Sequence, residues 1–188
     1  MIDCSYGLII RGGYAFLDTA ALDNRFSFFD HDSDLGFLKR TIELAHQARR
    51  EGNLPFGAIL VDSTGNVLLE QTNRVVTERD CTGHAETALA RRASKEYTQD
   101  KLWDCTLYAS CEPCAMCMAA IYWCNIGRVV YAITERDFLR KSPDESIMVP
   151  LDISCRQIAE CGQKSIVIQG PYPELMTEAV LPHAGFWE

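Results

Sequence analysis

The spacing of apolar and polar residues predicts an amphipathic helix over residues 33–53. Apolar side chains recur at every third or fourth position in the middle of this stretch. Ser33 or Asp34 provides an N-cap before the first apolar position, and Gly52 ends the pattern. The first regular element of the chain is therefore expected to be a long helix.

Downstream of this helix, short apolar runs predict strands, which alternate with further helices. The predicted strands are residues 56–62, 67–75, 105–110, 128–134 and 165–170. The further helices are predicted at residues 84–97, 114–124, 153–162 and 173–181. The first two strands form a hairpin, and the later alternation implies right-handed crossovers and a largely parallel sheet. The fold class is therefore α/β, a three-layer αβα sandwich around a mixed five-stranded sheet.

The first 30 residues mix glycine, aromatic and polar residues without a clear period. We interpret residues 1–30 as an N-terminal extension that packs on the domain or on a partner. A chain of 188 residues can build a single hydrophobic core, with little room for a second. Residues 31–188 are therefore expected to form one domain, which ends in the aromatic segment PHAGFWE.

Composition and charge limit the partners of the protein. Hydrophobic residues make up 47% and charged residues 23% of the chain, as in ordinary globular proteins. No run approaches the roughly 18 apolar residues of a membrane span, and MIDCSYGLII does not resemble a secretory leader. The formal charge of −8 opposes binding to nucleic acid. We therefore expect a cytoplasmic protein that binds neither membranes nor nucleic acid.

The nine cysteines do not resemble a disulfide framework, because their number is odd and the chain is not a small secreted scaffold. Cys105 and Cys124 lie in apolar runs and are expected to be small buried hydrophobic residues. The segment CEPCAMC, residues 111–117, differs because its three cysteines are evenly spaced. This segment is the first candidate for chemistry.

Two predicted helices begin with residue types that bind metals. TGHAETALA contains His84 and Glu86, and ASCEPCAMCMAA contains Cys114 and Cys117. In open α/β sheets, ligand sites gather where strands lead into helices, so the two segments can come together. Pro113 suits the first turn of a helix, which would place the two following cysteines three positions apart on one face.

Two thiolates and one imidazole are the protein ligands of a catalytic zinc site, in which water takes the fourth position. Glu86 is then free to transfer protons to and from a substrate. Residues two apart do not share a helix face, so His84 has to lie at the very start of its helix, which Gly83 permits. Cys111 precedes Pro113 at the end of a strand and is expected to point elsewhere.

Other interpretations of these residues are open. A lone CxxC also fits a redox pair or a packing accident, and an iron–sulfur run is broken by Ile121, which stands where the next cysteine would be. A closed structural zinc site that adds Cys111 is the stronger alternative, but it leaves Glu86 without a role. The combination H-x-E … P-C-x-x-C is more specific than either half and is typical of zinc deaminases.

Over residues 34–169 the chain resembles the cytidine-deaminase-like superfamily, in the branch of guanine, fungal-type cytosine and tRNA adenosine deaminases. LPFGAILVD, TNRVV, GHAE, LYASCEPCAMCMAAIYW and IGRVVYA carry this resemblance, in this order. It implies an αβα fold, a zinc ion held by His84, Cys114 and Cys117, and a homodimer. It also implies hydrolytic deamination, in which Glu86 moves the protons.

The resemblance further implies a pocket for a base. By family analogy, Asn73 in QTNRVV hydrogen-bonds the base, although a turn residue would look the same. Phe56 is similar to a pocket wall in the family, and an ordinary core position is the simpler alternative. Ala85 lies between the histidine and the glutamate, where a small side chain leaves room for a ring.

Three aromatic residues extend this prediction. Trp123 in AAIYW is similar to the guanine deaminase branch and is expected to flank the base or, alternatively, to pack in the core. Phe186 and Trp187, followed by Glu188, are expected either to cap the pocket, from the same or a neighbouring subunit, or to dock on the core.

One departure from the family concerns the loop after residues 128–134. Guanine deaminases of this type carry Gly-Phe-Asp-Asp in that loop, whereas this chain reads TERDFLRKSPDESIM. Asp137, Asp144 and Glu145 are therefore only loose candidates for a second acid. This difference weakens the case for guanine itself.

We expect a zinc-dependent hydrolytic deaminase that releases ammonia from a small nucleobase or nucleoside, with a guanine-like purine slightly favoured. Cytosine and tRNA adenosine are the alternative substrates, and the net charge of −8 opposes the second. A non-catalytic, zinc-stabilised module is the alternative from a different class. It has no use for Glu86, which argues against it.

Overall fold

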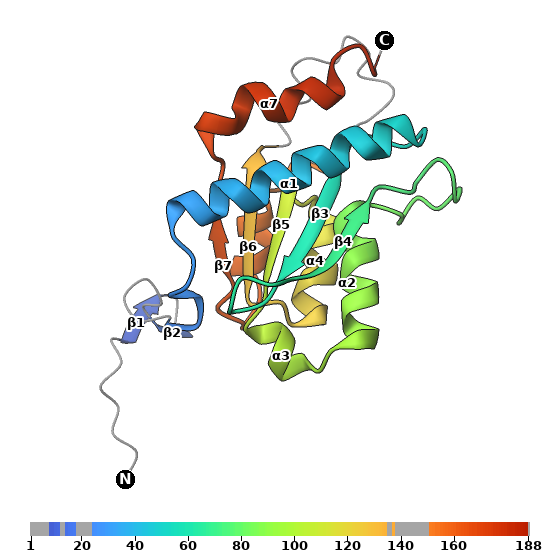
Figure 1. Cartoon of the computed structure of the whole chain (residues 1–188). Helices are drawn as coiled ribbons and strands as arrows, with labels where there is room; N and C mark the ends of the chain where they lie inside the picture. Colours follow the sequence, from blue (N-terminus) through green and yellow to red (C-terminus); the bar gives the residue numbers. More distant parts are fainter. Residues whose placement is uncertain (1–7, 12–13, 18–23, 135–136, 138–150, 188) are drawn as a thin grey trace.

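The computed structural model describes residues 8–11, 14–17, 24–134, 137 and 151–187. Its centre is a five-stranded sheet in the order β4-β3-β5-β6-β7 (Figure 1). The strands are β3 (Gly57–Val61), β4 (Val67–Thr72), β5 (Thr106–Cys111), β6 (Arg128–Ile133) and β7 (Val167–Gln169). β3 pairs antiparallel with both β4 and β5, and β5, β6 and β7 are parallel. The mixed sheet predicted from the sequence is confirmed, although its parallel part is limited to these three strands.

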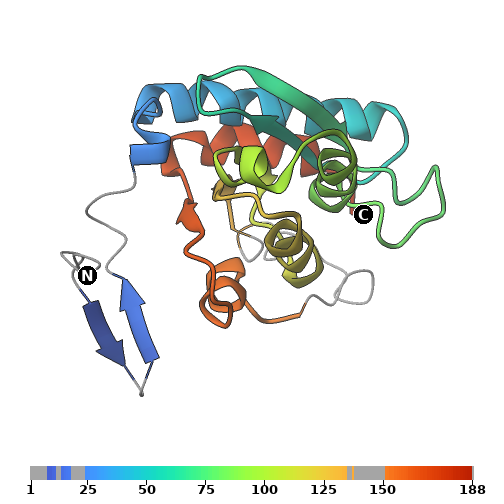
Figure 2. The ribbon, with the colours of Figure 1, turned by 90° about the horizontal axis from the view of Figure 1, so that it is seen from below.

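Helices cover both faces of the sheet, as Figures 1 and 2 show. One face carries α1 (His31–Arg50) and α7 (Met176–Val180), and their apolar residues share a core with one side of the sheet. The other face carries α2 (Ala85–Glu96), α4 (Ala115–Cys124) and α6 (Cys155–Glu160), which form the second core. The predicted three-layer arrangement is therefore confirmed.

The alternation of side chains along β5 explains the two cores. Leu107 and Ala109 pack toward α2 and α4, whereas Tyr108 packs toward α1. Both faces of this central strand are therefore buried, which accounts for its nearly continuous apolar sequence. On the α1 face, a Cβ atom at Gly57 would lie 2.5 Å from Leu44 Cβ, so glycine lets α1 approach β3 closely.

Several boundaries differ from the predictions. The first helix begins at His31, because Asp30 is its N-cap: Asp30 Oδ1 accepts from Ser33 N at 2.8 Å, and Ser33 Oγ accepts from Asp30 N at 2.9 Å. Ser33 is thus the third helical residue and Asp34 the fourth. The strand predicted to reach residue 75 ends at Thr72, and the helix predicted over residues 173–181 divides into η2 (Pro173–Leu175), α7 and η3 (Leu181–His183).

Three short elements were not predicted from the sequence. They are the hairpin of β1 (Leu8–Arg11) and β2 (Tyr14–Leu17), the 3-10 turn η1 (Asn24–Phe26) and helix α3 (Gln99–Trp103). The two hairpin strands form a separate two-stranded antiparallel sheet. None of the helices that the structure describes is long and apolar enough to cross a membrane.

A buried polar cluster joins α1 to the beginning of β6. The Asp34 carboxylate accepts from Arg128 Nη1 at 3.0 Å and from Arg128 Nη2 at 2.6 Å. It also accepts from the hydroxyl groups of Tyr108 at 2.6 Å and Tyr172 at 2.8 Å. Both side chains of the ion pair are only 3% exposed. Because the charges are paired and hydrogen-bonded, this cluster fixes α1 against the sheet.

Candidate active site

The N-terminus of α2 supplies the first two candidate residues. His84 is the N-cap, with extended backbone angles (φ −60°, ψ 146°), and its side chain makes no capping hydrogen bond. Glu86 follows in the first turn of the helix. The loop before His84 is closed by Arg74 N, which donates to Gly83 O at 2.8 Å. His84 therefore lies at the very start of its helix, as predicted, which allows His84 and Glu86 to face the same site.

The N-terminus of α4 also has a candidate metal ligand at its N-cap position. Cys114 is its N-cap, with φ −63° and ψ 173°, and again no side-chain cap is formed. Cys117 is the third helical residue, so the two sulfur atoms lie on one face. Pro113 precedes the cap and is not in the first turn, which corrects the expectation from the sequence.

These two helix starts bring three ligand residues together. The ligand atoms of His84, Cys114 and Cys117 all lie within 4.8 Å of one another, and Cys114 Sγ is 3.7 Å from His84 Nδ1. A tetrahedral zinc ion holds such sulfur and nitrogen atoms about 3.5–3.8 Å apart. One imidazole and two thiols at this spacing fit zinc.

Cys111 lies outside this cluster. Its side chain is buried in the hydrophobic core under α1, on the other face of the sheet from α2 and α4. A closed zinc site that uses Cys111 as its fourth ligand is therefore not formed. Cys105 and Cys124 are buried free thiols, which confirms their predicted place in the core.

The pKa values of the two ligand cysteines shift in opposite directions. Hydrogen bonding with Cys117, followed by the effect of His84, lowers the pKa of Cys114 to about 4, against the opposing effect of burial. The hydrogen bond with Cys114 and burial raise the pKa of Cys117 above its usual value. The lowered pKa of Cys114 favours its thiolate, the form that binds a metal.

Glu86 lies beside the cluster but is not part of it. Its side chain is buried, and Oε2 accepts from Cys117 Sγ at 3.5 Å. Burial, reinforced by the charge of Cys114, raises the pKa of Glu86 to about 7, although His84 acts in the opposite direction. A carboxyl group with this pKa can both accept and return a proton at neutral pH.

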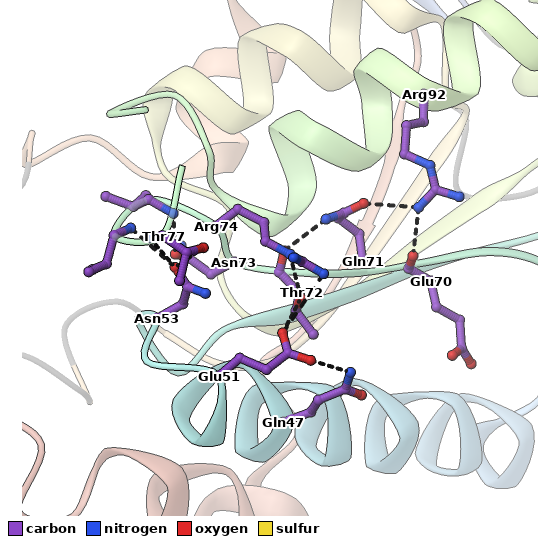
Figure 3. Close-up of polar contacts among 12 residues, drawn as sticks. Gln47, Glu51, Asn53, Glu70, Gln71, Thr72, Asn73, Arg74, Thr77 and Arg92 are labelled. Carbon is purple, nitrogen blue, oxygen red and sulfur yellow. Dashed lines mark hydrogen bonds and ion pairs between the residues drawn. The ribbon is translucent and has the colours of Figure 1, made fainter. Parts of the chain in front are cut away.

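Asn73 follows β4 directly and is completely buried (Figure 3). Its backbone N donates to Phe56 O, and its Oδ1 accepts from Val75 N, both at 3.0 Å. Its side-chain Nδ2 has no hydrogen-bond partner among the residues that the structure describes. A buried amide with an unused donor is suited to bind a ligand acceptor.

Asn53 is a second buried amide that sequence reasoning missed (Figure 3). Its Oδ1 accepts from Val76 N at 3.1 Å, Thr77 N at 3.0 Å and Thr77 Oγ1 at 3.1 Å. Within the described part of the chain, its Nδ2 also lacks a partner. No sequence signal marks Asn53, because an asparagine after Gly52 is typical of an ordinary helix end.

The C-terminal segment packs next to Phe56. The Phe56 and His183 rings are 5.1 Å apart, and His183 stacks on Trp187 at 6.2 Å with an interplanar angle of 11°. Phe186 lies edge-on to Trp187, with 4.8 Å between the ring centroids. Arg49 fixes the segment on α1 by donating to Pro182 O at 2.8 Å and Ala184 O at 2.7 Å. Through Phe56, this aromatic segment is connected to Asn73.

The other predicted pocket residues lie in different surroundings. Ala85 is fully buried in the core between α2 and the sheet. Trp123 is 76% exposed, so its alternative reading as a core residue is wrong. It lies about 9 Å further along the axis of α4 than Cys117. Asp137 accepts a hydrogen bond from the Thr134 hydroxyl at 2.6 Å. Asp144, Glu145 and Glu188 lie outside the described residues.

Fold and site together define a zinc-type hydrolase centre built at two helix N-termini. The chain belongs to the cytidine and deoxycytidylate deaminase family, because residues 31–133 match the zinc-binding region of that family. It is therefore a deaminase-type hydrolase with zinc as its cofactor. The resemblance inferred from the sequence motifs is confirmed.

Relatives within the family differ in substrate. The chain is 40% identical over 157 residues to a probable cytosine deaminase of Schizosaccharomyces pombe, covering 84% of this chain and 94% of the relative. The crystal structure of guanine deaminase from Bacillus subtilis is 37% identical, with a TM-score of 0.51, and the match covers 66% of this chain and 85% of that one. A guanine deaminase from Nitrosomonas europaea, at 23% identity, TM-score 0.62 and coverage of 79% and 81%, shares the fold.

Proposed function

We propose that this protein hydrolytically deaminates a small nucleobase or nucleoside and releases ammonia. The buried Glu86 carboxyl group beside the three ligands His84, Cys114 and Cys117 is the observation that carries this proposal. When bound, zinc would supply a water molecule that is activated near neutral pH. A structural zinc site has no need for a carboxyl group at this position.

Glu86 is the proton carrier in this proposal. Because the carboxyl group is buried beside the ligands, with Oε2 at 3.5 Å from Cys117 Sγ, it can take a proton from water and deliver it to a ring nitrogen. The same group, again a carboxylate, can then take the second proton from the hydroxyl group added to the ring carbon and pass it to the departing amine, so that a carbonyl group and ammonia form. The closed environment of Glu86 strengthens its interaction with charge that develops in the transition state.

Asn73 would bind the base through its free Nδ2. This donor favours a substrate that presents a carbonyl oxygen near the carbon that carries the amine, and guanine and cytosine both do so, whereas adenine has no carbonyl group. Phe56, Phe186 and Trp187 would form the apolar wall of the pocket, and Ala85 would leave space for the ring.

A guanine-like purine is the first substrate to test, as the motif resemblance favours it. Cytosine is the second candidate, because the S. pombe relative matches over 94% of its own length and is described as a probable cytosine deaminase. Trp123 gives the purine no structural support, since its ring is 76% exposed. We further propose a homodimer, from the resemblance, and a cytoplasmic location, from the composition.

A tRNA substrate is less well supported. Relatives include a tRNA-specific adenosine deaminase of Haemophilus influenzae, which is 35% identical over 54% of this chain. The net charge of −8 opposes the phosphate contacts on which nucleic-acid affinity depends. The small-molecule reaction is therefore the better conclusion.

Ammonia release by the zinc-loaded chain tests this function. Guanine, cytosine, adenine, their nucleosides and a tRNA anticodon stem-loop are offered at equal concentration, and the chelator-treated protein is the matched control. We expect turnover of guanine or cytosine and none without metal. Turnover of adenosine in a tRNA anticodon stem-loop alone would overturn the small-molecule proposal, and silence across all substrates with zinc bound would favour the structural-zinc alternative.

A further inference from the structure

Helix α2 directs a third polar side chain toward the metal cluster. Thr87 Oγ1 donates a hydrogen bond to Cys117 Sγ at 3.2 Å. Thr87 follows Glu86 directly and lies three residues after His84, so it shares a helix face with the imidazole ligand. The sequence motifs did not single out this threonine.

The Thr87 hydroxyl donates across to α4 and not within its own helix. In helices, a threonine hydroxyl often bonds to a carbonyl oxygen three or four residues earlier. Here the carbonyl four residues earlier, Gly83 O, accepts from Arg74 N at 2.8 Å, and the hydroxyl hydrogen bond goes to Cys117 Sγ at 3.2 Å.

The two cysteine ligands have different surroundings. Cys114 is the N-cap of α4 and is partly buried, and its sulfur lies 3.7 Å from His84 Nδ1. Cys117 lies within the helix and is completely buried, and its hydroxyl donor comes from a different helix, α2. Thr87 thus gives the buried Cys117 sulfur a hydrogen-bond donor from a second helix.

We propose that Thr87 is a positioning residue of the metal centre, whose hydroxyl orients the Cys117 thiolate and withdraws electron density from its sulfur. This inference rests on the metal site of the proposed function. Groups that hydrogen-bond metal ligands fix the ligand orientation and tune the metal, and their loss typically costs about 10–100-fold in metal affinity. Because Cys117 is buried, water cannot replace the lost donor.

Substituting Thr87→Val in the full chain removes the hydroxyl and keeps the branched shape, whereas Thr87→Ser keeps the hydroxyl. Cobalt(II) alone is the probe, since its thiolate charge-transfer band reports the electron density on sulfur. In Thr87→Val we expect this band at longer wavelength and zinc bound about tenfold more weakly in a chelator competition. In Thr87→Ser, band and affinity should match the unsubstituted chain.

Ser94→Ala is the matched control on α2, because Ser94 is exposed and its hydroxyl donates to Arg91 O, within the same helix. It should leave the cobalt spectrum unchanged. If Thr87→Val does not fold, Thr87→Ala provides the same comparison in a smaller side chain. An unchanged band and unchanged zinc affinity in a folded variant without the hydroxyl would overturn the proposal.

This test separates Thr87 from the proposed reaction, because no substrate is present. A shifted band in a protein that deaminates nothing would support the role of Thr87 and contradict the proposed function. If the unsubstituted chain is an active deaminase and Thr87→Val has the same cobalt band as that chain, the proposed function is supported and the role of Thr87 is contradicted. An unsubstituted chain that binds no cobalt would contradict the metal centre on which the inference rests.

Discussion

At the end of the sheet where β6 begins, Asp34 and Arg128 form a buried ion pair, whereas at the end where β5 finishes, Glu86 lies buried beside three ligand residues. In the first cluster the carboxylate accepts hydrogen bonds from an arginine and two tyrosines. In the second, Glu86 Oε2 accepts from Cys117 Sγ at 3.5 Å. The segment between β4 and α2 leads into His84, and there the Asn73 amide nitrogen has no partner among the described residues, nor has that of Asn53, which binds this segment. Buried carboxyl groups occur at both ends, but the unused donors lie beside the segment that leads to the ligands.

The difference lies in how each end compensates for burial. Around Asp34, opposite charges and hydrogen bonds keep the ion pair stable in the interior. At the end of the sheet where β5 finishes, burial shifts two ionisable groups toward their neutral forms: it raises the pKa of Glu86, beside the ligands, to about 7, and it lowers that of His183, beside Phe56, to about 3. The first arrangement holds the fold together, and the second keeps groups ready for a metal and a substrate.

Helix capping shows the same division. The N-cap side chains Asp30 of α1 and Ser154 of α6 both form capping boxes. His84 and Cys114 occupy the N-cap positions of α2 and α4 without capping either helix. A good N-cap contributes about 1 kcal/mol, so these two helix starts give up stability in favour of metal binding.

The largest effect on stability is expected at the closed cluster. Arg128→Met leaves the Asp34 carboxylate buried without its cation, which should lower the free energy of unfolding by about 3–5 kcal/mol. Zinc affinity should stay unchanged, because the ligands lie at the other end of the sheet. Urea unfolding and metal titration measure the two quantities.

Arg40→Met is the control for this variant. Arg40 pairs with Glu70 at 2.7 Å, but these side chains are 41% and 36% exposed, so the loss should be about 0–1 kcal/mol. Equal losses from the two arginine variants, or loss of zinc from Arg128→Met, would contradict the separation of the two ends.

A smaller effect is expected from acid at the other end of the sheet. Burial first, and then the charges of Arg49 and His46, lower the pKa of His183 to about 3 from an ordinary value of 6.5. His183 therefore binds a proton below about pH 6.5 in the unfolded chain, but only below about pH 3 in the folded chain. His183 should thus cost about 2 kcal/mol of stability at pH 5 relative to pH 8.

Replacing His183→Phe should remove this part of the pH dependence and keep a ring between Phe56 and Trp187. Unfolding free energies of this variant and of the unsubstituted chain at pH 8 and pH 5 measure it. If His183→Phe lost as much stability between these pH values as the unsubstituted chain, the inference that His183 is neutral in the folded protein would be wrong.

The smallest effect is expected at Asn53, which acts at a distance from the chemistry. Asn53 and Asn73 together accept hydrogen bonds from three consecutive backbone amides, Val75 to Thr77 (Figure 3). Glu51, the C-cap of α1, also pairs with Arg74 at 3.8 Å. Losing the Asn53 contacts should therefore loosen the segment that orients Asn73.

We expect Asn53→Ala to raise the KM for the base by about tenfold, equivalent to about 1.4 kcal/mol, with kcat nearly unchanged. Steady-state kinetics measure both constants. Asn66→Ala, in the exposed turn between β3 and β4, is the matched control. A fall in kcat with constant KM would place Asn53 in the chemical step instead.

The sequence predicted the order of the elements well, because alternating apolar runs and helical periods are local signals. It also brought His84, Cys114 and Cys117 together, since strand-to-helix junctions converge in α/β sheets. It missed Asn53, Thr87 and the Asp34–Arg128 pair. Each of these residues makes its hydrogen bond or ion pair with a residue that is distant in the sequence. The sequence around a single polar residue does not indicate which distant residue it contacts.

Glu86→Gln tests the central claim most directly. The two side chains have nearly the same size, but the amide cannot take and return a proton. Zinc content and ammonia release are measured on the same preparation. We predict one zinc ion per chain, as in the unsubstituted protein, with turnover reduced by at least about 100-fold. Retained turnover, or loss of the metal, would contradict the role of Glu86 as the proton carrier of a zinc deaminase.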